Sequence, residues 1–464
     1  MKWKSVTMWV SLVLTLSLLL AACSGGGNKG GNGSPAAPSN GGASESSPPA
    51  SESAPAGKVE LDFWTFWGSE TRRPIIEKII NEFNESQDRI FVKHTYLPWG
   101  DIWTKSTAAI AAGSPPDVIV QDINNGPARA ANGQVTKITE YVERDNVKEW
   151  FYPELWNTVL YNDDVYALPF NTDTRFLFYN KEAFREAGLD PEKPPTTWDE
   201  LEQYAIQLDK KSGNRYDRIG FYPLWGNFGY DAWLLNAEAD GNSYFNYATG
   251  DVTIDTPAKR EAIHWINKWT ERLGQSTVDA FMAEFGSQQA DPFIAGKVAM
   301  IVTTGTFYTQ LRDYAPDMDF GVAAVPEKSP GNGHWTSGGG FVVEIPAGVK
   351  NPDAAWEFLK WLGGPQAQEH WAALNFDNVA NIAAAESAVN HEGLNAKGKE
   401  VYQFAVDNMK WTKINPMPLE APQYWDLKNP QIDAALLGQK TPEQALAQAQ
   451  KDVEDLIARE KAKQ

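Results

Sequence analysis

The chain is poor in the residues that build disulfides and metal sites. Its 464 residues include one cysteine, Cys23, and five histidines. A single cysteine excludes an intramolecular disulfide, and the scattered histidines lack the spacing of metal ligands. There is no Gly-x-Ser-x-Gly elbow, no His-Glu-x-x-His motif and no P-loop ending in Gly-Lys-Ser or Gly-Lys-Thr. Esterase, zinc protease and nucleotide hydrolase functions therefore lack support, and we expect no cofactor and no metal.

The chain also lacks a long hydrophobic run. The apolar stretch from Met8 to Leu20, preceded by Lys2 and Lys4, is too short for a spanning helix of about 20 residues and is typical of a secretory signal peptide. It ends in Leu-Ala-Ala-Cys23, which resembles the lipobox of bacterial lipoproteins. The resemblance implies cleavage of residues 1–22 and acylation of Cys23, including palmitate. We therefore expect a lipid anchor on the extracellular face of a cell membrane.

Residues 23–57 contain almost no large apolar side chain. The segment is nearly all Gly, Ser, Pro, Ala and Asn. Such a composition offers nothing to bury and predicts a disordered linker. As a flexible coil, its roughly 34 residues give a reach of about 30 Å. We therefore expect a tether between the lipid and the folded part.

Positive charge is in deficit. The chain has 60 acidic residues against 41 Lys and Arg, a formal net charge of −19. Nucleic-acid binding rests on neutralising phosphates with basic side chains, so a nucleic-acid partner is not expected. The acidic excess favours solubility. About 400 residues follow the tether, more than one core usually organises, which predicts two lobes.

Hydrophobic patterns in those residues alternate between strand and helix. Alternating apolar positions predict a strand from Val59 and another over residues 90–96, with a helix from Ile75 to Phe83 between them. The continuous apolar run 118–120 is typical of a parallel strand covered on both faces. Capping boxes at Thr197 and Thr441 predict two further helices. The order indicates α/β lobes with largely parallel sheets.

Several ordered blocks carry a family resemblance. The run from Val165 to Lys181 (VYALPFNTDTRFLFYNK) and the later blocks Ala187-Gly-Leu and Pro195-Thr-Thr-Trp resemble the family 1 extracellular solute-binding proteins, carbohydrate receptors of ABC importers similar to maltose-binding protein. Three more blocks agree, namely Ala-Gly-Ser-Pro-Pro-Asp117, Ala295-Gly-Lys-Val-Ala-Met and Gly338-Gly-Gly with Ala354-Ala-Trp-Glu-Phe-Leu. The resemblance spans about Val59 to Ile457.

The resemblance implies a two-lobed α/β fold of the periplasmic-binding-protein type, with the ligand cleft between lobes. Lobe 1 is expected over residues 58–171 and 326–372, and lobe 2 over 172–325 and 378–464, with crossovers near Asn171, near Val325 and at 373–378. Hinge closure around the ligand would then be recognised by the membrane permease. We expect a monomeric receptor that is not an enzyme. Lipobox, tether and module together resemble the Gram-positive version.

A sugar presents hydroxyls at its rim and apolar faces above and below. Its site needs aromatic platforms with planar acceptors and donors around them, and carboxylates suit the rim. The predicted ligand contacts are aromatic or charged residues in loops that follow strands: Trp64, Trp67, Glu70, Asp122, Asp173, Arg175, Trp225, Tyr230, Asp231, Phe307, Trp335 and Trp425. About five platforms favour an oligosaccharide.

Some of these residues have a second reading. Asp122 could simply cap a helix, and Arg175 could pair with Asp173 instead of donating to a hydroxyl. Asp173 and Phe307 are expected from the resemblance alone, and phenylalanine departs from the tryptophan common in the family. The glycines after Ser337 could admit a ligand or only form a tight turn.

Three other functions remain open at this point. A secreted glycoside hydrolase also uses tryptophan platforms with carboxylates, but it needs two of them facing one bond. A polyamine receptor would pair its cationic ligand with carboxylates and aromatic rings. A surface adhesin would leave the cleft without a ligand.

Overall fold

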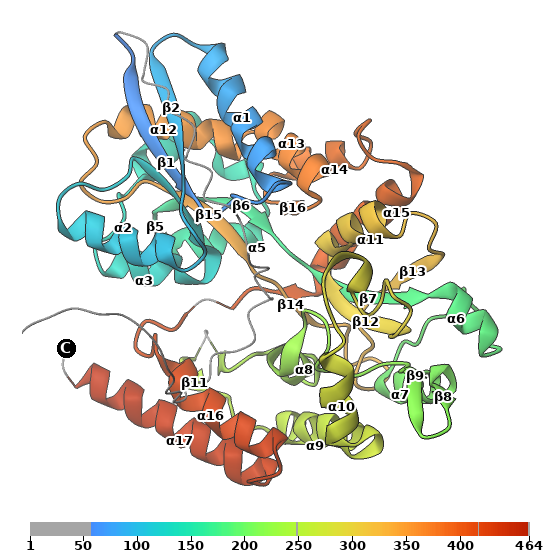
Figure 1. Cartoon of the computed structure of the whole chain (residues 1–464). Coiled ribbons are helices and arrows are strands. Elements are labelled where there is room, and N and C mark those ends of the chain that lie inside the picture. The colour runs from blue at the N-terminus through green and yellow to red at the C-terminus, as the bar shows by residue number, and fades with distance from the viewer. Residues whose placement is uncertain (1–56, 247–248, 416, 463–464) are drawn as a thin grey trace, which may run out of the picture. The chain divides into compact units, whose positions relative to one another are not determined.

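A six-stranded mixed sheet and a three-stranded antiparallel sheet organise the folded chain (Figure 1). The computed structural model describes residues 57–246, 249–415 and 417–462, so the predicted leader, Cys23 and the tether up to residue 56 lie outside the described residues. The described residues all belong to one compact unit. Among the described residues, no helix is long and apolar enough to cross a membrane.

The six-stranded sheet has the order β16-β6-β15-β3-β1-β2. The first three strands in the chain run parallel, while β15 is antiparallel to β3 and β6, and β16 is antiparallel to β6. The strands are β1 (Val59–Thr65), β2 (Ile90–Tyr96), β3 (Val118–Asp122), β6 (Ala167–Thr172), β15 (Gly340–Glu344) and β16 (Asn378–Val379). The predicted strands are confirmed, but the prediction of largely parallel sheets is wrong because later segments enter the sheet antiparallel.

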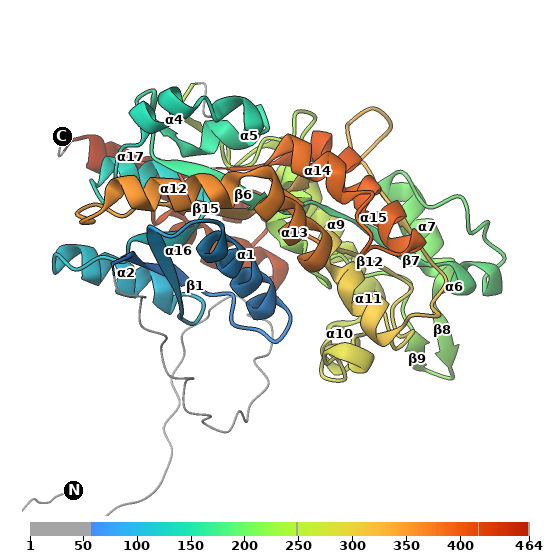
Figure 2. The same ribbon diagram turned by 90° about the horizontal axis from the view of Figure 1, so that it is seen from above.

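Helices cover this sheet. Helices α1, α12 and α13 pack against it and against one another, and Figure 2 shows them side by side. The apolar face predicted for the first helix is confirmed, since Ile75, Ile76, Ile79, Ile80 and Phe83 are its buried residues. The helices before and around this sheet are α1 (Arg72–Ser86), α2 (Asp101–Ala111), α3 (Gly126–Ala131), α4 (Thr139–Asp145), α5 (Pro153–Trp156), α12 (Pro352–Gly363), α13 (Pro365–Asn375) and α14 (Ile382–Ala388).

The second sheet has the order β12-β7-β13, with every pair antiparallel. Its strands are β7 (Arg175–Asn180), β12 (Met300–Thr304) and β13 (Phe320–Ala323). Side chains of β7 alternate between two hydrophobic clusters: Phe176 and Phe178 belong to the cluster that includes the six-stranded sheet, and Leu177 and Tyr179 belong to the other. This strand therefore joins the two cores.

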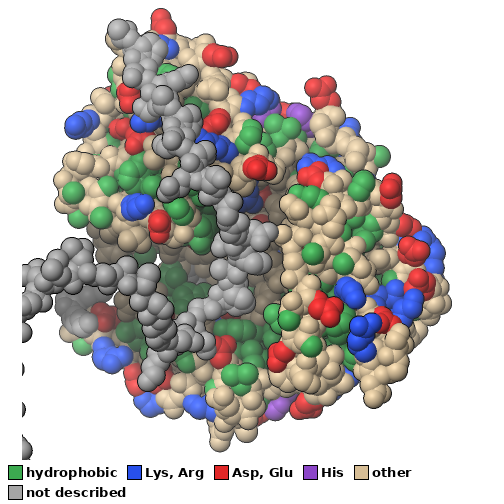
Figure 3. All heavy atoms as spheres, in the orientation of Figure 1, with side chains coloured by type: hydrophobic (Ala, Val, Ile, Leu, Met, Phe, Trp, Pro, Cys, Tyr) green, Lys and Arg blue, Asp and Glu red, His purple; other side chains and the backbone are tan. Residues whose placement is uncertain are grey.

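The second cluster is enclosed by helices. Trp198, Trp233 and Trp265 meet inside it, with ring centroids 4.2 to 5.8 Å apart. The helices around it and around the small sheet are α6 (Lys181–Glu186), α7 (Trp198–Leu208), α8 (Gly229–Asn236), α9 (Pro257–Leu273), α10 (Gln275–Met282), α11 (Tyr308–Tyr314), α15 (Ala396–Asn408), α16 (Tyr424–Leu436) and α17 (Pro442–Lys461). On the face shown in Figure 3, acidic and basic side chains are interspersed.

The remaining elements are short. Four two-stranded ribbons are β4 (Leu160–Tyr161) with β5 (Asp164–Val165), β8 (Lys210–Ser212) with β9 (Arg215–Arg218), β10 (Phe245–Asn246) with β11 (Asp251–Val252), and β14 (Thr336–Ser337) with β17 (Thr412–Lys413). The described 3₁₀ turns are η1 (Ile123–Asn125), η2 (Lys148–Trp150), η3 (Asn157–Val159), η4 (Gln288–Ala290), η5 (Gly305–Phe307) and η6 (Met409–Trp411).

The chain passes between the two sheets at three places. It leaves β6 at Thr172 and enters β7 at Arg175, and it returns between β13 and β15. After β16 the chain passes back to the three-stranded sheet, where α15 packs against β7. At the second passage, Gly340 has φ +133°, and an added Cβ would lie 2.2 Å from the carbonyl oxygen of Asn171. Glycine is required there because β15 and β6 approach closely.

Candidate functional site

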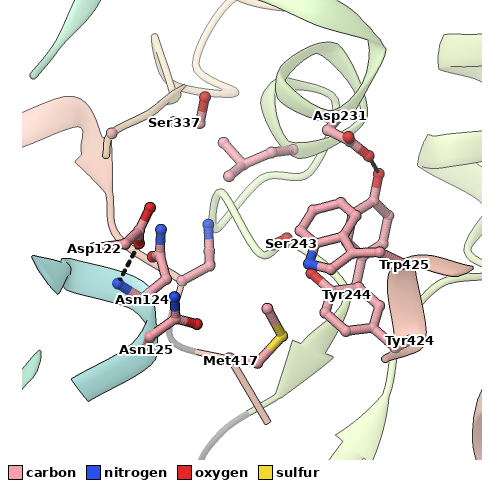
Figure 4. Close-up of a pocket in the computed structure, with 13 residues that line it drawn as sticks. Asp122, Asn124, Asn125, Asp231, Ser243, Tyr244, Ser337, Met417, Tyr424 and Trp425 are labelled. Carbon is pink, nitrogen blue, oxygen red and sulfur yellow. Dashed lines mark hydrogen bonds between the residues drawn. The ribbon is translucent and has the colours of Figure 1, made fainter. Parts of the chain in front are cut away.

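A cavity of about 330 Å³ opens between the loop after β3 and the N-terminal end of α16 (Figure 4). Its wall is built by segments that are far apart in the sequence. The lining residues are Asp122, Asn124, Asn125, Asp231, Leu235, Ser243, Tyr244, Ser337, Gly338, Asn415, Met417, Tyr424 and Trp425. Three of the predicted contacts, Asp122, Asp231 and Trp425, are among them.

One wall of the cavity is polar. Asp122, Asn124 and Asn125 lie side by side where β3 ends and η1 begins (Figure 4). The backbone N–H of Asn124 donates to Asp122 Oδ1 over 2.8 Å, so this carboxylate does cap the short turn. Its burial raises the pKa of Asp122, and the hydrogen bonds from Asn124 oppose that rise. The wall therefore offers amide donors and acceptors beside one carboxyl group.

The opposite wall is aromatic. Tyr244, Tyr424 and Trp425 gather there in Figure 4. The ring centroids of Tyr424 and Trp425 are 4.5 Å apart at 32°, and Tyr244 meets Trp425 edge to face at 6.1 Å. The two tyrosines are buried, while Trp425 is only partly buried. Trp425 is therefore the ring most available to a ligand, and the tyrosines hold it in place.

Asp231 is the second carboxylate of the cavity, and it is paired from behind. Its Oδ1 lies 2.5 Å from Lys428 Nζ and also accepts a hydrogen bond from the hydroxyl of Tyr244. The Lys428 side chain is 0% exposed, and its Nζ lies 4.3 Å from the centroid of Tyr244 and 4.5 Å from that of Trp425. Lys428 thus neutralises Asp231 and contacts the aromatic wall from inside.

Asp173 and Arg175 lie next to the cavity lining. Arg175 Nη1 donates to Asp173 Oδ1 over 2.8 Å and to the carbonyl oxygen of Ser337 over 2.6 Å. Asp173 Oδ1 also accepts from the N–H of Gly339 over 3.0 Å. An added Cβ at Gly338 would lie 2.9 Å from the Asp173 carbonyl oxygen. This carboxylate and guanidinium therefore pair with each other and position the strand that supplies Ser337.

Three predicted platforms lie in the protein core. Trp67 is 1% exposed and packs between Phe170 and Trp371, with centroid distances of 5.1 and 4.3 Å. Trp225 is 3% exposed and Phe307 is 6% exposed. These rings are enclosed by other side chains, and none of the three is among the residues that line this cavity.

The other four predicted contacts lie outside the cavity lining. Trp64 donates through Nε1 to Asp62 over 2.7 Å, and Glu70 is exposed. Tyr230 covers Lys428, with its centroid 5.1 Å from Nζ. Trp335 lines a different cavity of about 680 Å³. The structure thus gathers Asp122, Asp231 and Trp425 and separates them from these four.

The chain is similar to known proteins over most of its length. Residues 67–369, more than half of the chain, match the family described as bacterial extracellular solute-binding protein. The chain belongs to this family. It is accordingly an ABC-transporter solute-binding protein, a receptor and not an enzyme, and the prediction made from the sequence blocks is confirmed. The hydrolase alternative is thereby set aside.

Individual relatives are distant. The structure of CpMnBP1 with mannotriose bound is similar at a TM-score of 0.73 and 26% identity, over 85% of this chain and 100% of that one. The maltotriose-binding protein of Pyrococcus abyssi (strain GE5 / Orsay) is 28% identical over 56% of this chain and 53% of its own length. The sn-glycerol-3-phosphate-binding periplasmic protein UgpB of Escherichia coli (strain K12) is 25% identical over 63% of this chain and 67% of its own length. The predicted two-lobed α/β fold class is confirmed.

Several lining residues of this solute-binding protein were not singled out from the sequence. Asn125 lies three residues after the predicted contact Asp122, and Tyr424 adjoins Trp425, so proximity in the sequence could have indicated both. Tyr244 carries a weaker signal, since it follows a turn at Gly241. Asn415 and Met417 sit in a segment without a regular pattern, although Met417 N–H donates to the Asn124 carbonyl over 2.8 Å. That long-range bond is invisible to local sequence reasoning.

Proposed function

We propose that this solute-binding protein binds an oligosaccharide and delivers it to an ABC permease. The observation that carries the proposal is the opposition of two walls in one cavity. Trp425 offers a platform for an apolar sugar face, and Asp122, Asn124 and Asn125 offer hydrogen bonds to hydroxyls on the other side. Two relatives are named for, or solved with, oligosaccharides, which supports the same class.

A phosphate ligand fits this cavity less well. UgpB is named for sn-glycerol 3-phosphate. An anionic headgroup is held most strongly by the cationic side chains of Arg and Lys. Of the described residues that line the cavity, none is Lys or Arg, so an anion would find no cationic side chain to pair with in this lining. The nearby cations, Arg175 and Lys428, are already paired with carboxylates.

A polyamine also fits less well. Polyamines need carboxylates free to pair with ammonium groups. Asp231 is already neutralised by Lys428, and burial raises the pKa of Asp122, which weakens its hold on a negative charge. A neutral, hydroxyl-rich ligand fits both carboxyl groups better than a polyamine does, because it needs only hydrogen bonds from them.

The proposal is tested by titration calorimetry of residues 58–464. The panel comprises maltotriose, mannotriose, sn-glycerol 3-phosphate and spermidine at one salt concentration. We expect at least one trisaccharide to bind with a Kd in the micromolar range or tighter. Binding of spermidine or sn-glycerol 3-phosphate, with no response to either sugar series, would refute it.

The acidic side of the pH range offers a second check. Because burial raises the pKa of Asp122 above 3.8, this group takes up a proton at a higher pH than an ordinary aspartate. A protonated carboxyl forms weaker hydrogen bonds with hydroxyls, by about 1 kcal/mol. Sugar affinity should therefore fall about fivefold as the pH drops through that pKa. In Asp122→Asn, sugar affinity should no longer depend on pH over this range. If the variant shows the same pH dependence as wild type, Asp122 does not contact the sugar.

Delivery involves the two lobes predicted from the resemblance, residues 58–171 with 326–372 and residues 172–325 with 378–464. The cavity draws lining residues from both sets, for example Asp122 and Trp425. A ligand that contacts both lobes favours the state in which they close, and such a state is a signal that a permease can read. We propose that the two lobes have these boundaries. We also propose that the receptor is a monomer.

Anchoring is the last element of the proposal. Acylation of Cys23 and the tether would keep the receptor near its permease while it turns freely. Cys23→Ser should release the protein into the medium, with its sugar affinity unchanged and cellular uptake of the sugar lost. Fractionation of cells and calorimetry on the released protein measure both effects. Retention of the variant in the membrane fraction would contradict the anchor.

A further inference from the structure

An exposed cluster of aromatic rings lies outside the cavity. This aromatic patch consists of Phe66, Tyr96, Trp99, Trp103 and Phe341. Trp99 meets Phe66 and Trp103 edge to face at 4.7 Å each, and Phe341 at 5.8 Å. Trp99 is 59% exposed and Tyr96 is 45% exposed. Large aromatic rings are costly to leave in water, so an exposed Trp99 that packs on three further rings marks an interaction site.

The patch adjoins the polar wall of the cavity. Phe341 on β15 is the direct partner of Asp122 on β3. Residues directly opposite each other in an antiparallel pair project to the same face of the sheet, with Cβ atoms about 5 Å apart. Phe66 and Tyr96 stand at the carboxyl ends of β1 and β2, the same sheet edge at which Asp122 ends β3. The rings therefore continue the edge that supplies the cavity's hydrogen-bonding groups.

The cavity itself is small. Its volume of about 330 Å³ is at the lower end of the range of ligand sites, about 300–1,000 Å³. A ligand of several sugar units exceeds it and must extend beyond its mouth. Aromatic rings next to the mouth can carry the protruding units, because each unit again has an apolar face that stacks on a flat ring.

We propose that the aromatic patch is the outer part of the binding site and takes the units of a longer oligosaccharide that the cavity does not enclose. Trp99 is its principal platform. The proposal rests on the function proposed above and adds a preference for chain length. The geometry favours a sugar over a membrane surface, because the patch continues into the cavity edge and the chain's net charge of −19 opposes an anionic bilayer.

The test compares short and long ligands of one series on residues 58–464. Maltose and maltohexaose form one pair, and mannobiose and mannohexaose the other. In the series that binds, wild type should favour the hexasaccharide. Trp99→Ala should weaken hexasaccharide binding about tenfold, equivalent to about 1.4 kcal/mol, and leave disaccharide binding within twofold. Trp99→Phe, which keeps a smaller ring, should fall between wild type and Trp99→Ala.

The outcomes separate the two proposals. If wild type binds neither series, the proposed function fails. If wild type binds both lengths but Trp99→Ala weakens them equally or not at all, the outer platform is wrong while the function stands. Two further measurements test other occupants of the patch. Flotation with vesicles of phosphatidylcholine and phosphatidylglycerol measures membrane binding, and sedimentation equilibrium measures dimer formation. Loss of vesicle binding or of a dimer in Trp99→Ala, with hexasaccharide affinity unchanged, would assign the patch to a membrane or to a second copy.

Discussion

Trp425→Ala should lower the affinity for oligosaccharide about a hundredfold. Trp425 is the partly exposed ring of the aromatic wall, and Tyr424 and Tyr244 pack against it. Truncating an aromatic side chain at the centre of a binding site commonly costs about 2 to 4 kcal/mol, and a hundredfold loss corresponds to about 2.8 kcal/mol. Calorimetry with the trisaccharide that binds wild type measures the loss.

The matched control is Trp335→Ala. Trp335 is also a partly buried indole in a loop, but it lines the other cavity, and Lys413 Nζ lies 4.2 Å from its ring centroid. This variant should retain sugar affinity within about twofold while it loses a comparable packing interaction. Equal losses in both variants would show that the effect of Trp425 is structural and would move the sugar site away from the cavity.

Local patterns predicted the elements of the fold well. The buried residues of α1 are those of the predicted apolar face, and β2 begins and ends as predicted. Thr441 forms its capping box with Gln444. Thr197 caps α7, but Glu200 reaches back to Thr196 instead of Thr197. These features depend on neighbours within four residues, which a sequence displays directly.

Strand direction was harder to predict. The run of residues 118–120 did form a fully buried strand, as predicted. It lies between parallel β1 and antiparallel β15, however, and β15 comes more than two hundred residues later in the chain. Pairing across such a separation is decided by the passages between the sheets, and no local pattern encodes it.

The aromatic contacts show the same limit. Trp67 and Trp425 both occur beside loop residues, and each was predicted to be a platform. Trp67 is enclosed because Phe170 and Trp371, from β6 and α13, close over it. Trp99 was not singled out, although it remains the most exposed of the rings in its patch. Burial is set by residues distant in sequence, so composition and spacing cannot rank aromatic residues as ligands.

The largest change in specificity should come from Lys428→Met. This substitution keeps an unbranched apolar chain and removes the charge beneath the aromatic wall. Asp231, whose side chain is 37% exposed, then has no cation behind it. Breaking a buried ion pair costs about 3 to 5 kcal/mol, and the partial exposure of Asp231 reduces the expected loss of folding free energy to about 2 kcal/mol. Chemical denaturation measures that loss.

The ligand profile should change with it. In Lys428→Met, the rings of Tyr230, Tyr244 and Trp425 lose their cation–π contacts with Nζ. The aromatic wall is then held less firmly, and we expect sugar affinity to fall at least tenfold. The unpaired carboxylate of Asp231 should instead attract cations, and spermidine binding should become measurable. The double variant Lys428→Met with Asp231→Asn should lose the gain in spermidine binding, because no charge remains to pair.

Lys259 supplies the control that separates specificity from stability. Its side chain is also 0% exposed, and its Nζ lies 2.9 Å from Glu238 Oε1, but neither residue lines the cavity. Burial lowers the pKa of both lysines, so the two ion pairs are physically alike. Lys259→Met should therefore destabilise the fold to a similar extent and leave the ligand profile unchanged. If Lys259→Met also binds spermidine, then the spermidine binding of Lys428→Met reflects a general loss of stability. In that case the Lys428–Asp231 ion pair does not determine the selectivity for sugar.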